Sequence, residues 1–281
     1  MREYELGLGG GRMIQLSNPS LSQMMGYVID TPDGGVILID GGNYDEENAL
    51  KLREILALRN NRVDLWFITH AHDDHHGALT YLLEHTDVSL DIGCLYLNFP
   101  PNEWLAQRED NTTNEIFLEQ IRRRNIRTQT VQAGDSFLCG GVGVKVLSAP
   151  EDYCDYPNIN STSLILKVCF PCREILFLGD FDVFAQEEYL TKHSSEELAC
   201  DVVQMAHHGQ GGVDRSFYEL IRPKYCLYTA PKWLWENNYF LRTDPTTAGK
   251  GPFTIMETRR WMEEMGAIQS FSFENGDIVF T

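Results

Sequence analysis

The chain has 281 residues, of which 43% are hydrophobic and 11% aromatic, so it can bury one large core or two small ones and is not disordered as a whole. Its 23 basic and 41 acidic residues give a net charge of −18, which argues against a protein that coats long nucleic acids. A small anionic substrate is compatible with this charge, because a bound cation dominates the field around it.

The sequence lacks the features of a membrane or secreted protein. No apolar run approaches the roughly 18 residues of a membrane helix, and Met1–Leu6 does not begin a secretory signal. The seven cysteines are scattered, which favours a reducing compartment and predicts a cytoplasmic protein that makes no membrane contact. Cys169 and Cys172 flank Pro171 at a predicted hairpin, and we interpret them as turn and strand cysteines, not zinc ligands.

The first half of the chain alternates short apolar runs with helical patterns. A Pro-Asp-Gly turn separates the first two predicted strands. The predicted strands are Met25–Asp30, Val36–Asp40, Val63–Thr69, Asp91–Asn98, Arg127–Gln132, Ser136–Leu138 and Val142–Leu147; the predicted helices are Glu46–Leu58, Gly77–Leu83 and Asn114–Arg123.

The second half repeats this order. The predicted strands are Ser163–Phe170, Glu174–Leu178, Val202–Ala206, Tyr225–Tyr228, Ile268–Phe273 and Asp277–Phe280; the predicted helices are Arg215–Ile221 and Phe253–Met265. Two groups of strands, each followed by helices, predict an α+β fold in which two sheets form a four-layer αββα sandwich. We expect a single domain over residues 1–281, in which the aromatic stretch Pro231–Pro252 forms a lid, a packed surface loop or a dimer contact.

The strongest chemical signal is the run His70-Ala71-His72-Asp73-Asp74-His75, at the end of the predicted strand Val63–Thr69. His70 and His72 point the same way in an extended chain. Asp74 and His75 follow on the turn that enters the next helix. Imidazole and carboxylate groups are suitable ligands for zinc and related metals, so we predict a metal site here; a solvated polar loop is the alternative.

This run resembles the His-x-His-x-Asp-His signature of the metallo-β-lactamase superfamily, and Val36–Asp40 followed by Gly41 and Gly42 resembles an early strand of that family. The resemblance implies two divalent metal ions, with zinc expected and manganese or iron as alternatives. It implies that Asp180, after the apolar strand Glu174–Leu178, bridges the two ions. Asp40 is then either a partner that orients a ligand histidine or an ordinary turn residue.

His207-His208-Gly209 resembles the His-His-Gly motif of the branch that includes DNA-uptake competence hydrolase domains and phosphorylcholine esterases. Neighbours on an extended strand face opposite ways, so we expect one of the pair to bind metal. The resemblance assigns His208 to the metal and His207 to the substrate.

The sequence departs from many family members between the first cluster and Asp180, because the expected further ligand histidine is absent and 158–164 is rich in Asn and Ser. One metal would then have only His70, His72 and Asp180 as protein ligands, while Asp74, His75 and His208 would hold the other. An open coordination position is what a catalytic metal needs. His207 or Asn160 could donate to an oxyanion, and with Asp74 they are our candidate catalytic residues.

The resemblance implies a hydrolase that uses a metal-bound hydroxide, with a phosphoric ester as the first choice of substrate. The alternatives are hydrolysis of a carboxylic ester, a lactone or a β-lactam, since the fold does not fix the substrate, and a non-enzymatic metal-binding interaction module. A redox di-iron role is less favoured. We expect a small-molecule partner and no long nucleic acid; the sequence does not indicate an oligomeric state.

Overall fold

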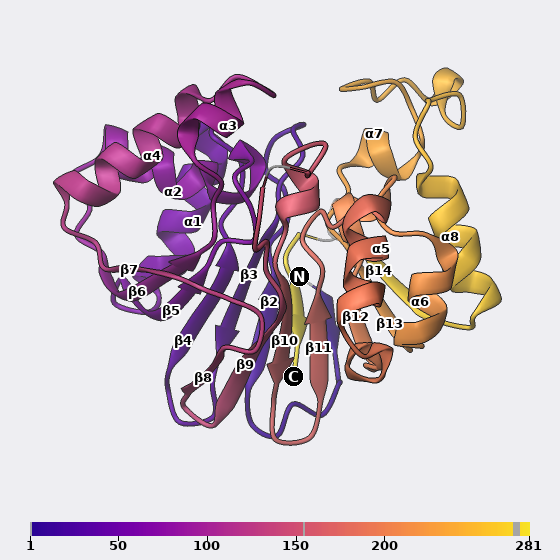
Figure 1. Cartoon of the computed structure of the whole chain (residues 1–281), viewed down its shortest axis with the longest axis horizontal. Helices are drawn as coiled ribbons and strands as arrows, with labels where there is room; N and C mark the ends of the chain where they lie inside the picture. The colour runs from indigo at the N-terminus through magenta and orange to yellow at the C-terminus, as the bar shows by residue number, and fades with distance from the viewer. Residues whose placement is uncertain (1, 154, 272–275) are drawn as a thin grey trace.

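The computed structural model describes residues 2–153, 155–271 and 276–281. Within these residues the strands form two sheets that pack face to face, and helices cover both outer faces (Figure 1). The predicted α+β fold and its αββα layering are therefore confirmed. No helix in the described part of the chain is long and apolar enough to cross a membrane.

The first sheet has an antiparallel part and a parallel part. Along the sheet the order is β1 (Arg2–Tyr4), β15 (Ile278–Phe280), β2 (Arg12–Gln15), β3 (Gly26–Asp30), β4 (Val36–Asp40), β5 (Arg62–Phe67), β6 (Asp91–Leu97) and β7 (Thr128–Thr130). From β4 to β7 the pairing is parallel, so these strands end at one edge of the sheet.

The second sheet is built in the same way from the rest of the chain. Its order is β14 (Ile268–Phe271), β13 (Tyr225–Tyr228), β12 (Val202–Gln204), β11 (Glu174–Phe177), β10 (Ile165–Cys169), β9 (Val142–Ser148) and β8 (Ser136–Cys139). β11, β12, β13 and β14 run parallel, so the residues that follow β11 and β12 also lie at one edge.

The helices of each half cover the sheet of that half (Figure 1). On the first sheet lie α1 (Glu46–Ala57), α2 (Asp73–His85), α3 (Asn102–Ala106) and α4 (Thr112–Arg123). On the second lie α5 (Val183–Lys192), α6 (Arg215–Ile221), α7 (Lys232–Trp235) and α8 (Ile255–Glu264).

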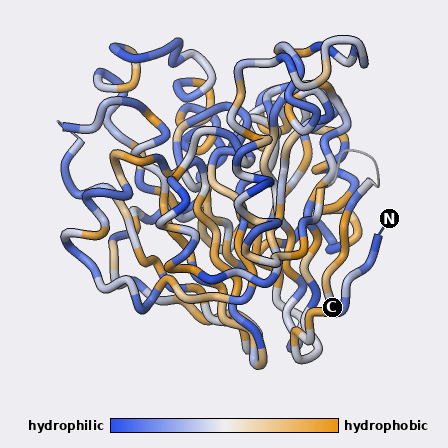
Figure 2. The backbone as a smooth tube through the Cα atoms, turned by 90° about the vertical axis from the view of Figure 1, so that its right-hand side faces the viewer, coloured by the Kyte–Doolittle hydropathy of each residue, from blue (hydrophilic) through white to orange (hydrophobic). Residues whose placement is uncertain are grey.

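Alternation along the strands supplies two buried faces. In β4, Ile37 and Ile39 belong to the core between the sheets, whereas Val36 and Leu38 pack under the helices. Across the inner core the rings of Tyr27 and Phe177 meet edge to face, with centroids 4.9 Å apart. Both faces of such a sheet are covered, which is why its strands form nearly continuous apolar runs (Figure 2).

Two expectations near the histidine motifs are wrong in detail. The helix predicted from Gly77 begins at Asp73, because His72 is its N-cap and Asp73 and Asp74 occupy the first turn, where negative charge is stabilising. The strand predicted to reach Ala206 ends at Gln204. A short 3₁₀ turn, η3 (Ala206–Gly209), replaces its end.

Other elements were not predicted at all. β1, β2, α3, α5 and α7 are short or lack a clean period in their own sequence, so packing against the rest of the molecule determines them. The end of the predicted strand Ile268–Phe273, at 272–273, and Cys154 lie outside the described residues.

The stretch 231–252 contains a buried part and an exposed part. Trp233 is buried, and its indole Nε1 donates to the Leu21 carbonyl at 2.7 Å. Phe240 packs edge-on against Trp233, with ring centroids 5.0 Å apart, but keeps 60% of its surface exposed. Together these contacts join this stretch to the loop between β2 and β3.

Candidate metal centre

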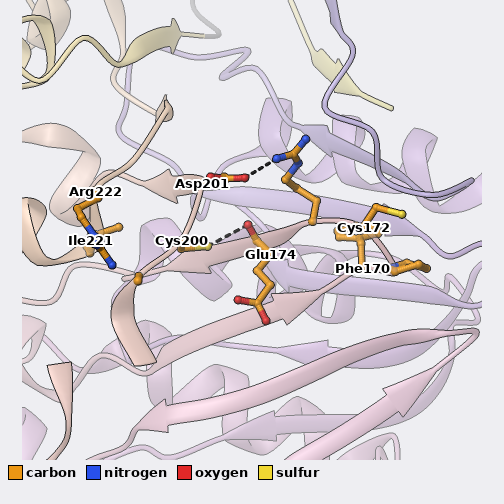
Figure 3. Close-up of a pocket in the computed structure, with 10 residues that line it drawn as sticks. Phe170, Cys172, Glu174, Cys200, Asp201, Ile221 and Arg222 are labelled. Carbon is orange, nitrogen blue, oxygen red and sulfur yellow. Dashed lines mark hydrogen bonds and ion pairs between the residues drawn. The ribbon is translucent and has the colours of Figure 1, made fainter. Parts of the chain in front are cut away.

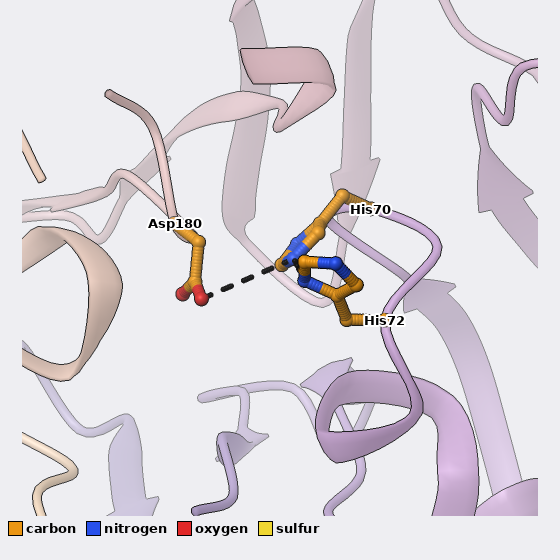
Figure 4. Close-up of side chains that lie close together, drawn as sticks. All are labelled: His70, His72 and Asp180. Carbon is orange, nitrogen blue, oxygen red and sulfur yellow. Dashed lines mark hydrogen bonds and ion pairs between the residues drawn. The ribbon is translucent and has the colours of Figure 1, made fainter. Parts of the chain in front are cut away.

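His70, His72 and Asp180 form a first ligand group at the edge where the parallel strands of both sheets end (Figure 4). The ligand atoms of the three residues all lie within 4.8 Å of one another. His70 Nε2 is 2.9 Å from His72 Nδ1 and 4.0 Å from Asp180 Oδ2. The strand end of β5 supplies the two histidines, as the spacing of the motif predicts.

The backbone after β11 determines where Asp180 lies. Gly179 has φ +54°, and a Cβ there would lie 3.0 Å from Thr69 Cβ, so a side chain is disfavoured on both counts. The backbone N–H groups of Leu178 and Gly179 donate to Gln204 Oε1, each at 2.8 Å. This turn brings the second sheet close to the residues that precede His70.

Asp74, His75 and His208 form a second ligand group, again with all ligand atoms within 4.8 Å of one another. His208 Nε2 is 3.0 Å from Asp74 Oδ2, and His75 Nε2 is 3.8 Å from Asp74 Oδ1. Asp180 also faces this group, at 3.3 Å from His75 and 3.6 Å from His208. One carboxylate therefore lies between the two groups.

The backbone separates His207 and His208 in a way that strand geometry does not describe. Both residues have left-handed φ, +49° and +56°, inside η3. The argument from an extended strand is therefore wrong, although the two side chains do differ. His208 is fully buried in the second ligand group, whereas His207 is 28% exposed with Nε2 3.8 Å from Asp180 Oδ2.

Three ligand histidines have a buried partner on the ring nitrogen that faces away from the ligand groups. His75 Nδ1 is 2.8 Å from Asp40 Oδ2, His70 Nδ1 is 3.2 Å from Thr69 Oγ1, and His208 Nδ1 is 3.0 Å from Thr229 Oγ1. Asp40 also accepts from the Thr69 backbone N–H at 2.8 Å. Such partners fix the orientation and tautomer of a ligand histidine.

Burial and close charges shift the protonation of the site. Burial opposes ionisation of Asp180, but the attraction of His75 and His208 outweighs it and holds the pKa of Asp180 well below its usual value. Burial, reinforced by His75 and His72, holds the pKa of His70 well below its usual value. For His75, burial is outweighed by Asp180, Asp40 and Asp74, which raise its pKa well above the usual value.

The donor atoms fit divalent metal ions. His75 Nε2, His208 Nε2 and Asp180 Oδ1 are buried and lie near charged neighbours, but none of them makes a hydrogen bond of good geometry, an arrangement that is costly without a ligand. Imidazole nitrogen and carboxylate oxygen are the donors that zinc and related first-row metals take. Each group, with Asp180 shared, therefore offers a fitting donor set for one ion.

Asn160 lies in the 3₁₀ turn η1 (Asn160–Thr162), beside the first ligand group. Its neighbour Ile159 packs with Ala71, which lies between the two ligand histidines. Asn160 Oδ1 is buried and has no hydrogen-bond partner. A catalytic role for Asn160 stays a prediction.

The cysteines lie apart from this centre. Cys172 is exposed at the turn between β10 and β11, beside an open pocket of about 560 Å³ (Figure 3). There Arg173 pairs with Asp201, and the Cys200 thiol donates to the Glu174 carbonyl at 2.9 Å. Among the described residues no cysteine belongs to a candidate metal group.

The sequence from residue 25 to residue 210 matches the family model of the metallo-beta-lactamase superfamily, and both ligand groups fall inside that segment. The chain belongs to the metallo-beta-lactamase superfamily. This superfamily consists generally of hydrolytic metalloenzymes, and its fold accounts for the two sheets with ligands at one shared edge.

One curated relative is ComE operon protein 3 of Bacillus subtilis (strain 168), 25% identical over 172 residues. The alignment covers 61% of this chain but 20% of that protein, so the chain spans about a fifth of the relative's length.

Solved structures share the metallo-beta-lactamase fold over nearly all of this chain. The protein YhfI from Bacillus subtilis has a TM-score of 0.54 at 10% identity, covering 96% of this chain and 99% of YhfI. CmlA, a diiron beta-hydroxylase from Streptomyces venezuelae, has a TM-score of 0.56 at 11% identity, covering 96% of this chain and 53% of CmlA. At these identities the similarity is one of fold.

Sequence reasoning missed two partners of the ligand histidines in this metallo-beta-lactamase centre. Thr229 follows β13, and Glu109 follows α3, where its carboxylate lies 3.3 Å from His72 Nε2. Neither position carries a local pattern that separates it from other loop residues. Only the packing of distant segments brings them to the site.

Proposed function

We propose that this chain is a hydrolase that holds two divalent metal ions, zinc in the first instance, and cleaves a small phosphoric ester. The observation that carries the proposal is Asp180, which lies between two ligand groups at 3.3 Å from His75 and 4.0 Å from His70. Two ions placed so, when bound, supply an activated water and neutralise charge that develops on the substrate.

The chain's own residues would do the rest. Asp74, His75 and His208 would hold one ion, and His70 and His72 the other, with Asp180 shared between them. Burial lowers the pKa of His207, so its partly exposed ring is neutral at pH 7 and carries one N–H. We assign that N–H the role of donating to an oxygen of the substrate, with Asn160 as the second candidate donor.

Exposure at the ligand groups favours an enzyme over a purely structural metal site. His72, a member of the first ligand group, is 18% exposed. His207, whose ring lies 3.8 Å from Asp180 of that group, is 28% exposed, so solvent reaches the first ligand group. Structural zinc sites are closed by four protein ligands, whereas a catalytic ion keeps a position for water or substrate. The first group supplies only three protein ligands among the described residues.

The net charge of −18 favours a small substrate over a long nucleic acid. We keep a carboxylic ester, a lactone or a β-lactam as the second class of substrate, because all of these reactions use the same activated water. The identity of the metal is also part of the proposal: zinc is the first choice, and the experiment below compares it with manganese and iron.

The experiment is a substrate panel with metal-loaded protein. Protein stripped with a chelator is reloaded with zinc, manganese or iron and assayed on bis(p-nitrophenyl) phosphate, p-nitrophenyl acetate, a lactone and a β-lactam. We expect phosphodiester turnover that the chelator abolishes and metal restores. The Asp180→Asn variant should be inactive, whereas His85→Ala, an exposed histidine outside the ligand groups, should retain activity.

If only the lactone, the acetate or the β-lactam is turned over, the substrate belongs to the second class and is not a phosphoric ester. Two bound ions without turnover of any substrate would favour the interaction module. A protein that binds no metal at these residues would contradict the proposal as a whole.

A further inference from the structure

His72 is oriented differently from the other ligand histidines. In His70, His75 and His208 it is Nδ1 that meets the outer partner. In His72 it is Nδ1 that faces the ligand group, 2.9 Å from His70 Nε2, and Nε2 that points outward. Without a metal, one of these two nitrogens can donate a hydrogen bond to the other; when both are unprotonated, they can bind a common cation.

The outward nitrogen of His72 meets a carboxylate. His72 Nε2 lies 3.3 Å from Glu109 Oε1 and also 3.3 Å from Glu109 Oε2. An ionised carboxylate only accepts hydrogen bonds, so it selects the tautomer in which Nε2 carries the proton and Nδ1 is free. Asp40 acts on His75 in the same way, because it accepts from one ring nitrogen, Nδ1, and leaves Nε2 free to face the ligand group.

Contacts of Trp104 and Arg108 hold the segment that carries Glu109 in place beside the first ligand group. The Trp104 indole Nε1 donates to the Tyr153 carbonyl at 2.7 Å, and the Arg108 guanidinium stacks 3.4 Å from the centre of the Trp104 ring. Arg108 also donates to the Tyr156 carbonyl at 3.0 Å.

Leu105 is buried against Ala71, the residue between His70 and His72. The Glu109 backbone N–H donates to the Leu105 carbonyl at 3.2 Å. The position of Glu109 next to His72 therefore follows from buried and stacked contacts, although its own side chain is 52% exposed.

We propose that Glu109 is a positioning residue that holds the His72 ring with Nδ1 toward the first metal. The inference rests on the proposed metal centre and adds to it a partner from the segment after α3. It also sets His72 apart from the other three ligand histidines, whose partners are buried, whereas the partner of His72 lies at the surface.

The test measures metal affinity by competition with a chromophoric chelator, with zinc as the probe and the full chain in each case. Loss of an outer partner lowers metal affinity by about 10- to 100-fold, so Glu109→Ala should weaken the first of the two sites by this factor. Glu109→Gln should lose less, because its amide oxygen still accepts from Nε2–H. The affinity of the second site should change less, because Glu109 contacts His72, which belongs to the first group.

Glu103→Gln is the matched control, since Glu103 is an exposed acid on the same segment. It removes the same charge without touching His72, so it should leave both affinities unchanged. Equal zinc affinities for Glu109→Ala and Glu103→Gln would overturn the inference.

A second readout is independent of affinity. In the zinc-loaded protein, ¹⁵N-resolved imidazole NMR should show His72 protonated at Nε2, and Glu109→Ala should broaden or shift that signal. Protonation at Nδ1 would also overturn the inference. Neither measurement depends on turnover, so a Glu109 result is separable from failure of the substrate panel.

Discussion

Asp180 Oδ1 lies 3.3 Å from His75 Nε2, although the two residues come from different sheets. The other carboxylate oxygen, Oδ2, lies 3.6 Å from His208 Nε2 and 4.0 Å from His70 Nε2. Asp180 is 2% exposed, so these attractions act with little screening by solvent. The two ligand groups are thus coupled through one buried side chain.

We expect Asp180→Ala to weaken both metal sites together. The substitution removes the carboxylate that faces both groups and leaves His75 and His208 without their shared counter-charge. Isothermal titration with zinc should show two weakened sites in this variant, whereas His208→Ala should mainly weaken one. Two undisturbed sites in Asp180→Ala would remove Asp180 from the centre.

His208→Ala should affect metal binding, whereas His207→Ala should affect turnover. His208 Nε2 lies inside the second ligand group, so its loss should lower metal occupancy. His207 lies outside both groups, so its loss should leave occupancy intact and slow turnover. Removal of one donor at a developing oxyanion costs about 10²- to 10³-fold in kcat. Metal analysis and kcat on the same preparations check both, and reduced occupancy in His207→Ala would reverse the two roles.

Asp40→Asn should lower metal affinity at the second group by about 10- to 100-fold. Asp40 is fully buried; its Oδ2 lies 2.8 Å from His75 Nδ1, and its Oδ1 accepts from the Thr69 backbone N–H at 2.8 Å. An amide can accept at only one of its two ends, so one of these contacts is lost. Zinc affinity is measured by competition with a chelator. The control is Asp33→Asn, because Asp33 is an exposed acid in the turn before β4; this variant should bind zinc as the unmodified chain does.

His76 should make the metal-free protein less stable in acid. Its ring stacks on Phe117 and its Nδ1 lies 2.9 Å from Thr80 Oγ1, and burial lowers its pKa to about 3. The unfolded chain takes up this proton near pH 6.5, as free histidine does. The contribution of His76 to the free energy of unfolding is therefore complete above about pH 6.5 and is lost as the pH falls toward 3.

The variant His76→Gln does not titrate in this range. Its free energy of unfolding, from urea denaturation in the presence of a chelator, should vary less between pH 6.5 and pH 4 than that of the unmodified chain. Equal dependence on pH in the two proteins would show that His76 is not buried in its neutral form.

Much of the fold was accessible from the sequence because it depends on local patterns. The apolar run that follows the Pro-Asp-Gly turn predicts the strand Val36–Asp40, and the helical spacing in Glu46–Leu58 predicts a helix, as the structure has them within one residue. The run His70–His75 places four of the six predicted ligands within six residues, so its chemistry is visible before any tertiary contact is known.

Only the tertiary structure decided how the distant parts of the centre meet. Asp180 and His208 come from another sheet, more than 100 positions along the chain from His70, and no period in the sequence specifies which loops share an edge. His207 and His208 follow the predicted strand Val202–Ala206 with a left-handed backbone, where the sequence argument assumed an extended chain. Glu109 and Thr229 are ordinary loop residues by sequence; they reach the ligand histidines because packing between the sheets and helices, which is non-local, determines where each loop ends.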